Sequence, residues 1–153
     1  MNTIGYISDN LFYRLNFETS QTEIELNPRG RSYQAFTSNY KKGVIVLADY
    51  GRNPCLYFHL QHVHDGSFEM SDFCQLEIRS IALSLDCKYL LVCCGLPENE
   101  ILVIDVEGKR VLQGEKSRVG VDDRKVLKME FNPGNNKIFA VMYDKEICVY
   151  QIV

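Results

Sequence analysis

The chain has 153 residues, which fits one domain or part of one at roughly 100 to 200 residues per domain. Its 17 Lys and Arg residues against 20 Asp and Glu residues give a formal net charge of -3, so no broad basic field is available to hold nucleic acid. Hydrophobic residues at 46% and charged residues at 24% exclude disordered, collagen-like and coiled-coil chains. A compact domain remains.

The start of the chain and its cysteines indicate the compartment. Residues 1–9 lack a basic segment followed by an apolar run, so we expect no secretory signal. The longest apolar run, 90–94, is far below the roughly 20 residues of a membrane-spanning helix, so we expect no membrane partner. The 6 cysteines are too sparse for a disulfide scaffold, and several lie in apolar runs. These features favour a reducing, cytoplasmic environment.

Short apolar segments, broken by Gly, Pro, Asn or Asp, follow one another along the chain. They are rich in Val, Ile, Tyr and Phe, as β-strands are, and no stretch keeps the helical period of about 3.6 residues over three turns. The sequence therefore predicts an all-β fold. The clearest expected strands, in chain order, are Leu11–Phe17, Val44–Ala48, Tyr89–Cys93, Ile101–Val106, Ile138–Val141 and Ile147–Ile152.

One strand phrase recurs at a fixed interval. Residues 101–106 (ILVIDV) recur as 147–152 (ICVYQI) and earlier as 55–60 (CLYFHL), with an interval of about 46 residues each time and a fainter copy at 12–17. Upstream of these phrases, residues 81–92 align without a gap on residues 129–140. Such a period indicates a repeat architecture. Each unit consists of three strands joined by polar turns and a short fourth strand such as 110–112.

The repeat resembles the WD-repeat β-propeller, whose blades are four-stranded sheets of about 40 to 45 residues. Ile104-Asp105 occupies the position of the family's Trp-Asp pair, although the chain has no Trp and keeps the Asp only at Asp105. The polar triad that joins the strands of regular blades is therefore not expected in most units. The resemblance implies a single partial propeller of about three and a half four-stranded antiparallel blades: an incomplete blade at 1–26, blades at 31–71 and 77–113, and an incomplete blade at 125–153.

Three segments resemble the amino-terminal propeller of axonemal cilia- and flagella-associated WD-repeat proteins. They are 4–11 (IGYISDNL), 16–19 (NFET) and 44–54 (VIVLADYGRNP). This resemblance implies a non-catalytic scaffold for protein–protein interactions, structural in the ciliary or flagellar axoneme, with axonemal or microtubule-associated partners. The alternative is a general cytoplasmic WD-repeat adaptor with no ciliary role.

About three and a half blades are fewer than the four to eight with which propellers typically close. Half-blades that stay open at both ends would leave backbone groups unpaired. We therefore expect the chain to be completed by further propeller sequence or by another chain. On its own, the chain should be poorly stable and prone to associate.

In a propeller, the turns between second and third strands and the turns between blades gather on one face, which is the usual partner surface of the family. In this chain these turns are 49–53, 95–100 and 143–146, together with 27–31, 71–73 and 115–124. Arg and Tyr are common interface anchors because they combine large contact area with directed hydrogen bonds. The candidate protein-interaction residues are therefore Arg29, Arg31, Tyr50, Arg52, Arg118 and Tyr143.

Segment 59–65 (HLQHVHD), with Cys55 and Cys74 nearby, is the only cluster that could hold a metal. However, His59 falls on the opposite strand face from His62 and His64, and neither a Cys-x-x-Cys nor a His-x(3-5)-His spacing supports a site. We expect a polar strand end and no metal.

No pattern predicts catalysis either. Adjacent Cys93 and Cys94 should point to opposite faces of a strand, one inward and one outward, as packing residues. The carboxylate pairs Glu98/Glu100 and Asp122-Asp123 lie in polar turns, where solvated charges are expected. A Gly-rich phosphate loop is absent. We therefore expect no enzymatic activity and no cofactor.

Overall fold

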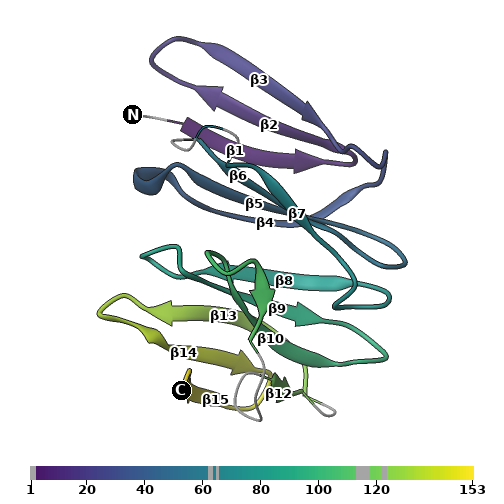
Figure 1. Cartoon of the computed structure of the whole chain (residues 1–153), viewed down its shortest axis with the longest axis vertical. Helices are drawn as coiled ribbons and strands as arrows, with labels where there is room; N and C mark the ends of the chain where they lie inside the picture. The colour runs from purple at the N-terminus through teal and green to yellow at the C-terminus, as the bar shows by residue number, and fades with distance from the viewer. Residues whose placement is uncertain (1–2, 62–63, 65, 113–117, 122–123) are drawn as a thin grey trace.

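The computed structural model consists of four antiparallel β-sheets that lie one after another along the long axis of the molecule (Figure 1). It describes residues 3–61, 64, 66–112, 118–121 and 124–153. The sheets follow chain order, so residues distant in sequence meet mainly where neighbouring sheets pack against each other. The predicted all-β fold class is confirmed.

Each sheet is a run of hairpin-connected strands. The first contains β1 (Thr3–Ser8), β2 (Leu11–Asn16) and β3 (Gln21–Leu26). The second contains β4 (Tyr33–Asn39), β5 (Val44–Asp49), β6 (Leu56–Leu60) and β7 (Phe68–Met70), with the 3₁₀ turn η1 (Tyr40–Lys42) after β4. The third contains β8 (Ile78–Leu83), β9 (Tyr89–Cys94), β10 (Glu100–Asp105) and β11 (Arg110–Val111). The fourth contains β13 (Val126–Asn132), β14 (Asn135–Tyr143) and β15 (Ile147–Gln151).

The six clearest strands expected from the sequence overlap β2, β5, β9, β10, β14 and β15. Polar side chains also bond to the backbone in the turn between β8 and β9. After β8, Ser84 Oγ donates to Asp86 Oδ1 at 2.7 Å and accepts from the Tyr89 N–H at 3.0 Å, while Asp86 Oδ1 also accepts from the Lys88 N–H at 3.1 Å. Cys87 has φ 62° in this turn. These bonds fix where β9 begins.

The outer edge of the third sheet departs from the expected single fourth strand. β10 pairs with β11 at residues 104–105 and with β12 (Arg118–Gly120) at residues 100–102. Because β11 has only two residues, it covers only part of the β10 edge, and β12 supplies partners for the backbone groups that remain. The segment 115–124, expected as a turn between blades, therefore contains a strand.

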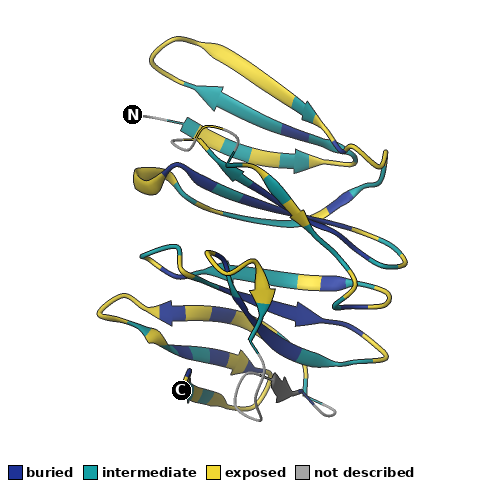
Figure 2. Ribbon diagram, viewed as in Figure 1, coloured by how far each residue is buried: buried dark blue, intermediate teal, exposed yellow. Residues whose placement is uncertain are grey.

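The hydrophobic core lies in layers between the sheets. Alternate residues of one strand enter different layers: Leu90, Val92 and Cys94 pack toward the second sheet, whereas Leu91 and Cys93 pack toward the fourth. Both faces of the two middle sheets are thus covered, and their strands are the most deeply buried (Figure 2). This explains the uninterrupted apolar run at 90–94, since a strand buried on both faces has no solvent side.

The burial of both faces corrects one expectation. Cys93 and Cys94 do point to opposite faces, but neither is outward, because each enters a core layer and both are almost fully buried. Burial raises the pKa of the Cys93 thiol to about 11, so this thiol stays protonated at neutral pH. Cys93 therefore packs as a small apolar side chain.

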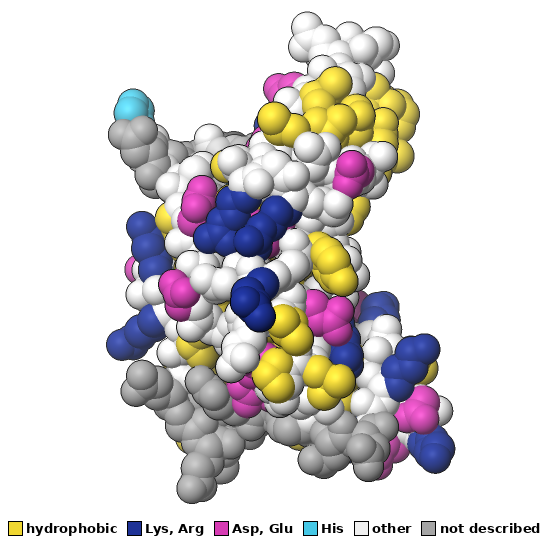
Figure 3. Space-filling view, turned by 90° about the vertical axis from the view of Figure 1, so that its right-hand side faces the viewer, with side chains coloured by type: hydrophobic (Ala, Val, Ile, Leu, Met, Phe, Trp, Pro, Cys, Tyr) yellow, Lys and Arg dark blue, Asp and Glu magenta, His cyan; other side chains and the backbone are white. Residues whose placement is uncertain are grey.

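Among the described residues, no sheet covers the outer face of the first sheet. Its side chains come from alternate positions of β1, β2 and β3, Ile24 is 61% exposed, and the rings of Tyr6 and Tyr13 stack at 4.7 Å between centroids. Hydrophobic atoms gather over this end of the molecule (Figure 3). None of the side chains of this face is charged; they are Ile4, Tyr6, Ser8, Leu11, Tyr13, Leu15, Thr22, Ile24 and Leu26.

The outer face of the fourth sheet is likewise uncovered within the described residues. Ile147 is 67% and Val149 69% exposed, beside Met142. On the same face, Lys128 and Glu130 pair with each other at 2.9 Å. Exposed apolar faces of this kind mark contact surfaces. We call these two surfaces the end faces.

We expect the isolated chain to self-associate through its end faces, because association removes their apolar side chains from water. Replacement of Ile24 and Val149 together by Lys should shift the chain toward monomer in sedimentation velocity runs over a range of concentrations. Glu107→Lys, an exposed change in the turn after β10, is the charge control. A wild-type chain that is monomeric at all concentrations and melts cooperatively would contradict this expectation.

Candidate protein-interaction surface

The turns after β5, β9 and β14 lie at the same end of the sheets as the segments that join one sheet to the next, on the right-hand side of Figure 1. Backbone hydrogen bonds join the two kinds of segment. Tyr50 N–H donates to Ser32 O at 2.8 Å, Gly95 N–H to Glu77 O at 2.9 Å, and Asp144 N–H to Lys125 O at 3.1 Å. We call this surface, made by residues 27–32, 50–55, 71–77, 95–99 and 144–146, the loop face.

A buried polar network holds the loop after β5. Asp49 is completely buried at the end of that strand. Its Oδ1 accepts from the Cys55 N–H at 2.7 Å, and its Oδ2 accepts from the Tyr57 hydroxyl at 2.9 Å. Burial and the hydrogen bond to Asp49 raise the pKa of Tyr57 far above its usual value. The two donors satisfy the carboxylate and close the loop over residues 50–54.

The network extends to the segment between the first two sheets. Asn27 is buried, its Oδ1 accepts from the Arg29 N–H at 2.8 Å, and the Tyr57 hydroxyl lies 3.3 Å from the same oxygen. The second sheet thus has a set of polar side chains that links its strands to the preceding segment. Asp105, at the position where the sequence resembles a WD-repeat Asp, instead accepts from the Gly108 N–H at 2.9 Å and closes a local turn.

Sequence reasoning missed the role of Asp49, which it placed in the turn 49–53 on the expected partner surface. The sequence did contain an indication of this role: Asp49 directly follows the apolar run 44–48 and directly precedes the Tyr50-Gly51 turn. An acidic side chain at that point can fold back to accept the backbone N–H groups of the loop that follows.

Two of the candidate arginines are fixed against the same loop. Arg29 Nη1 donates to Asn53 O at 2.9 Å, and Arg31 Nη1 donates to Arg52 O at 2.7 Å. Arg52 itself is exposed. Among the ion pairs between described residues, none involves Arg29, Arg31 or Arg52. Their positive charges therefore surround one loop without an ion-pair partner among the described residues.

The other three candidates differ from one another. Tyr50 is 53% exposed on the loop face beside the arginines. Tyr143 is only 2% exposed, because the Arg124 guanidinium covers its ring at 4.1 Å and its hydroxyl lies 3.1 Å from that of Tyr150. The expectation of an exposed Tyr143 is thus corrected. Arg118, expected in a loop, is the first residue of β12 and pairs with Leu102.

A groove of about 790 Å³ crosses the loop face from the second sheet to the third. Glu98, expected to be a solvated turn charge, lines it; its Oε1 accepts from the Gln75 N–H at 3.2 Å. Its Oε2 is buried, and no described residue donates a hydrogen bond to it. Lys and Arg side chains lie beside hydrophobic ones on the face that contains this groove (Figure 3). The lining residues include Arg52, Phe73, Leu76, Leu96, Pro97 and Glu98.

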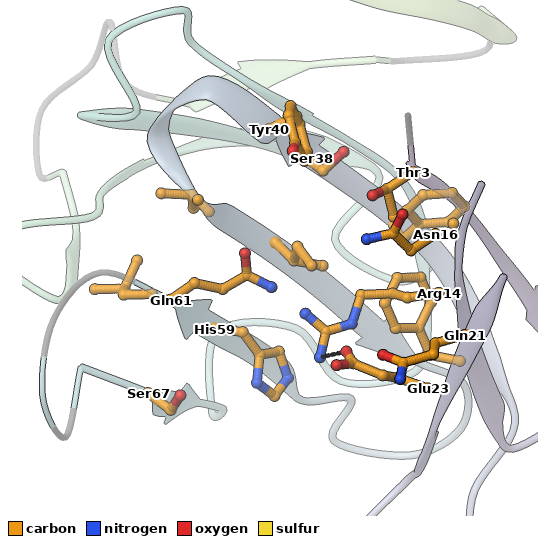
Figure 4. Close-up of a pocket in the computed structure, with 17 residues that line it drawn as sticks. Thr3, Arg14, Asn16, Gln21, Glu23, Ser38, Tyr40, His59, Gln61 and Ser67 are labelled. Carbon is orange, nitrogen blue, oxygen red and sulfur yellow. Dashed lines mark ion pairs between the residues drawn. The ribbon is translucent and has the colours of Figure 1, made fainter. Parts of the chain in front are cut away.

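A second cavity, of about 590 Å³, lies between the first and second sheets (Figure 4). Its ionisable side chains already contact partners within the chain. Arg14 Nη2 lies 2.7 Å from Glu23 Oε2, and His59 Nε2, which also lines the cavity, lies 2.8 Å from Glu25 Oε1. Because these side chains have partners within the chain, the cavity gives a weaker indication of a ligand than the loop face does.

Within the described residues, no group of three or more His, Cys, Asp or Glu side chains could hold a metal ion. His62, and with it part of the expected cluster, lies outside the described residues, as do Asp122 and Asp123. No helix among the described residues is long and apolar enough to cross a membrane.

Comparison with solved structures identifies the fold. Over 98% of this chain and 45% of the other, the structure is similar to a chain of the mitotic checkpoint complex, with a TM-score of 0.71 and 11% identity. Hsv2p of Kluyveromyces lactis gives a TM-score of 0.71 at 12% identity, and Hsv2 of Kluyveromyces marxianus 0.70 at 12% identity, each over 97% of this chain and 46% of the other. Neither a protein-family model nor a curated protein matches the sequence.

These solved structures are WD-repeat β-propellers, and the four sheets of this chain are therefore a partial β-propeller. At 11 to 12% identity the similarity shows the fold alone. The chain spans less than half the length of the solved chains that it matches.

We expect Asp49→Ala to lower the free energy of unfolding by about 2 to 4 kcal/mol, because the buried Cys55 N–H loses its acceptor and the Tyr57 hydroxyl keeps only the longer contact to Asn27 Oδ1. Urea denaturation of the two proteins measures the loss. The matched control is Asp144→Ala, at the exposed turn after β14, which should change stability by less than about 0.5 kcal/mol. Equal effects of the two substitutions would show that the buried network does not stabilise the loop.

Proposed function

We propose that the chain is a non-catalytic scaffold that presents the loop face to protein partners. The observation that supports this most directly is the group of unneutralised arginines, Arg29, Arg31 and Arg52, beside the exposed Tyr50. Arg and Tyr are the side chains most often found as energetic anchors of protein interfaces. The propeller fold, which supports rigid sheets with loops at one end, suits this role.

The rigidity of the loop face also supports the proposal. Asp49 is buried and satisfied by two donors, and the loop that it closes carries Tyr50 and Arg52. Anchors that are already positioned lose less conformational freedom when a partner binds.

A second class of partner is proposed for the end faces. The uncharged outer face of the first sheet and the apolar outer face of the fourth sheet are suited to cover by further propeller sheets. We propose that these sheets belong to another chain or to further propeller sequence. The loop face would then be one sector of a complete ring.

The experiment that tests the scaffold proposal is an affinity capture from the source cell with quantitative mass spectrometry. Tyr50→Ala combined with Arg52→Glu should reduce recovery of the captured partners by roughly tenfold, because two anchors are removed. Tyr40→Ala combined with Lys41→Glu is the matched control, since these exposed residues lie at η1, at the opposite end of the second sheet. Equal loss from both double variants, or from neither, would refute a role for the loop face.

We also propose, from the sequence resemblance of segments 4–11, 16–19 and 44–54, that the protein is a structural component of the ciliary or flagellar axoneme. A fluorescently tagged protein expressed in a ciliated cell should co-localise with axonemal microtubules and remain with them after detergent extraction. Diffuse cytoplasmic fluorescence that is lost on extraction would favour the alternative, a general cytoplasmic adaptor, and would leave the scaffold proposal standing.

A further inference from the structure

The groove on the loop face is built from three segments that hydrogen bonds hold together. Asn53 N–H, in the loop after β5, donates to Gln75 O at 2.7 Å, and Gln75 N–H donates to Glu98 Oε1 at 3.2 Å. Asp72 adds a second link, because its Oδ1 accepts from Asn53 Nδ2 at 2.8 Å. The loop after β5, the segment 72–76 and the loop after β9 therefore form a preformed surface for a ligand.

The part of the groove that belongs to the second sheet carries Arg52 and Asp72, and two further arginines lie next to it. Arg52 lines it, and Arg29 and Arg31 are tied to the carbonyls of residues 52 and 53. Each of these two guanidiniums donates through Nη1, which leaves its other N–H groups to bind a ligand. A planar guanidinium matches a carboxylate, and these charges have no acidic partner among the described ion pairs.

The walls of the groove are apolar. At the end of the groove formed by the loop after β9, a carboxylate oxygen of Glu98 can accept a hydrogen bond. Leu96 is 60% and Leu76 45% exposed, and Phe73 and Pro97 lie with them in the lining. In the loop after β9, the buried Glu98 Oε2 lacks a hydrogen-bond partner in the part of the chain that the structure describes. A buried carboxylate oxygen without a donor is costly, and a bound N–H group would satisfy it.

We propose that the groove binds an extended peptide segment of a partner protein that presents an acidic side chain, then apolar side chains, then a hydrogen-bond donor such as Lys. This inference rests on the proposed scaffold function and states the chemistry of its partner. The acidic side chain meets Arg52 and its neighbours, the apolar ones meet Leu76 and Leu96, and the donor meets Glu98. A continuous polyanion fits less well, because Asp72, Glu98 and Glu100 also line the groove.

The test is selection from a random peptide library displayed on phage, with the full chain immobilised. Enriched peptides should contain Asp or Glu followed by apolar residues and Lys. In fluorescence anisotropy, the strongest of them should bind Arg52→Glu roughly tenfold more weakly, and Lys41→Glu, on the opposite end, as tightly as the wild-type chain. Glu98→Gln should weaken binding of this peptide more than binding of its analogue in which Lys is replaced by norleucine.

Each other outcome of the selection overturns the inference. Peptides without acidic residues, a glutamine analogue that binds as well as the acidic peptide, retained affinity of Arg52→Glu, or no enrichment would each exclude it. If no such peptide binds but the affinity capture still recovers partners that depend on Tyr50 and Arg52, the peptide inference fails and the scaffold proposal stands. Displacement of the peptide by heparin at equal charge concentration would assign the site to polyanions instead.

Discussion

The structure depends on the fact that its middle sheets are apolar on both faces. Along β9, Leu91 and Cys93 enter one core layer and Leu90, Val92 and Cys94 enter the other. Such a sheet is stable only when another sheet covers each face, since every side left open exposes apolar area to water. The stacking of four sheets, and the two apolar faces at the ends of the stack, both follow from this requirement.

The same stacking creates the loop face. Because the second, third and fourth sheets have their second-to-third-strand turns at the same end as the segments between sheets, turns and segments become neighbours and exchange backbone hydrogen bonds, as at Tyr50–Ser32 and Gly95–Glu77. The buried Asp49 then holds the loop after β5 through hydrogen bonds from the Cys55 N–H and the Tyr57 hydroxyl. A surface made of loops is thereby given the rigidity of the sheets, which allows recognition residues to vary without loss of the fold.

The fold could be predicted from local signals, whereas much of the candidate site could not. Apolar segments that recur at a fixed interval indicate both the strands and the repeat. The preference of interfaces for Arg and Tyr in turns led to Arg52 and Tyr50. The burial of Tyr143 depends on Arg124 and Tyr150, whose approach no turn pattern encodes. The buried Asp49 and the unpartnered Glu98 oxygen likewise depend on contacts made only in three dimensions.

The burial of β9 on both faces has a consequence for strand register. In a sheet with one wet face, a one-residue slip turns polar side chains into the core and is strongly disfavoured. Along residues 90–94 a slip would exchange one apolar side chain for another, so polarity provides little discrimination. The register must then be set by contacts at the ends of the strand. The hydrogen bonds of Ser84 and Asp86 to the backbone of Lys88 and Tyr89 set it at the start of β9. This short polar turn therefore determines which residues of β9 face each core layer.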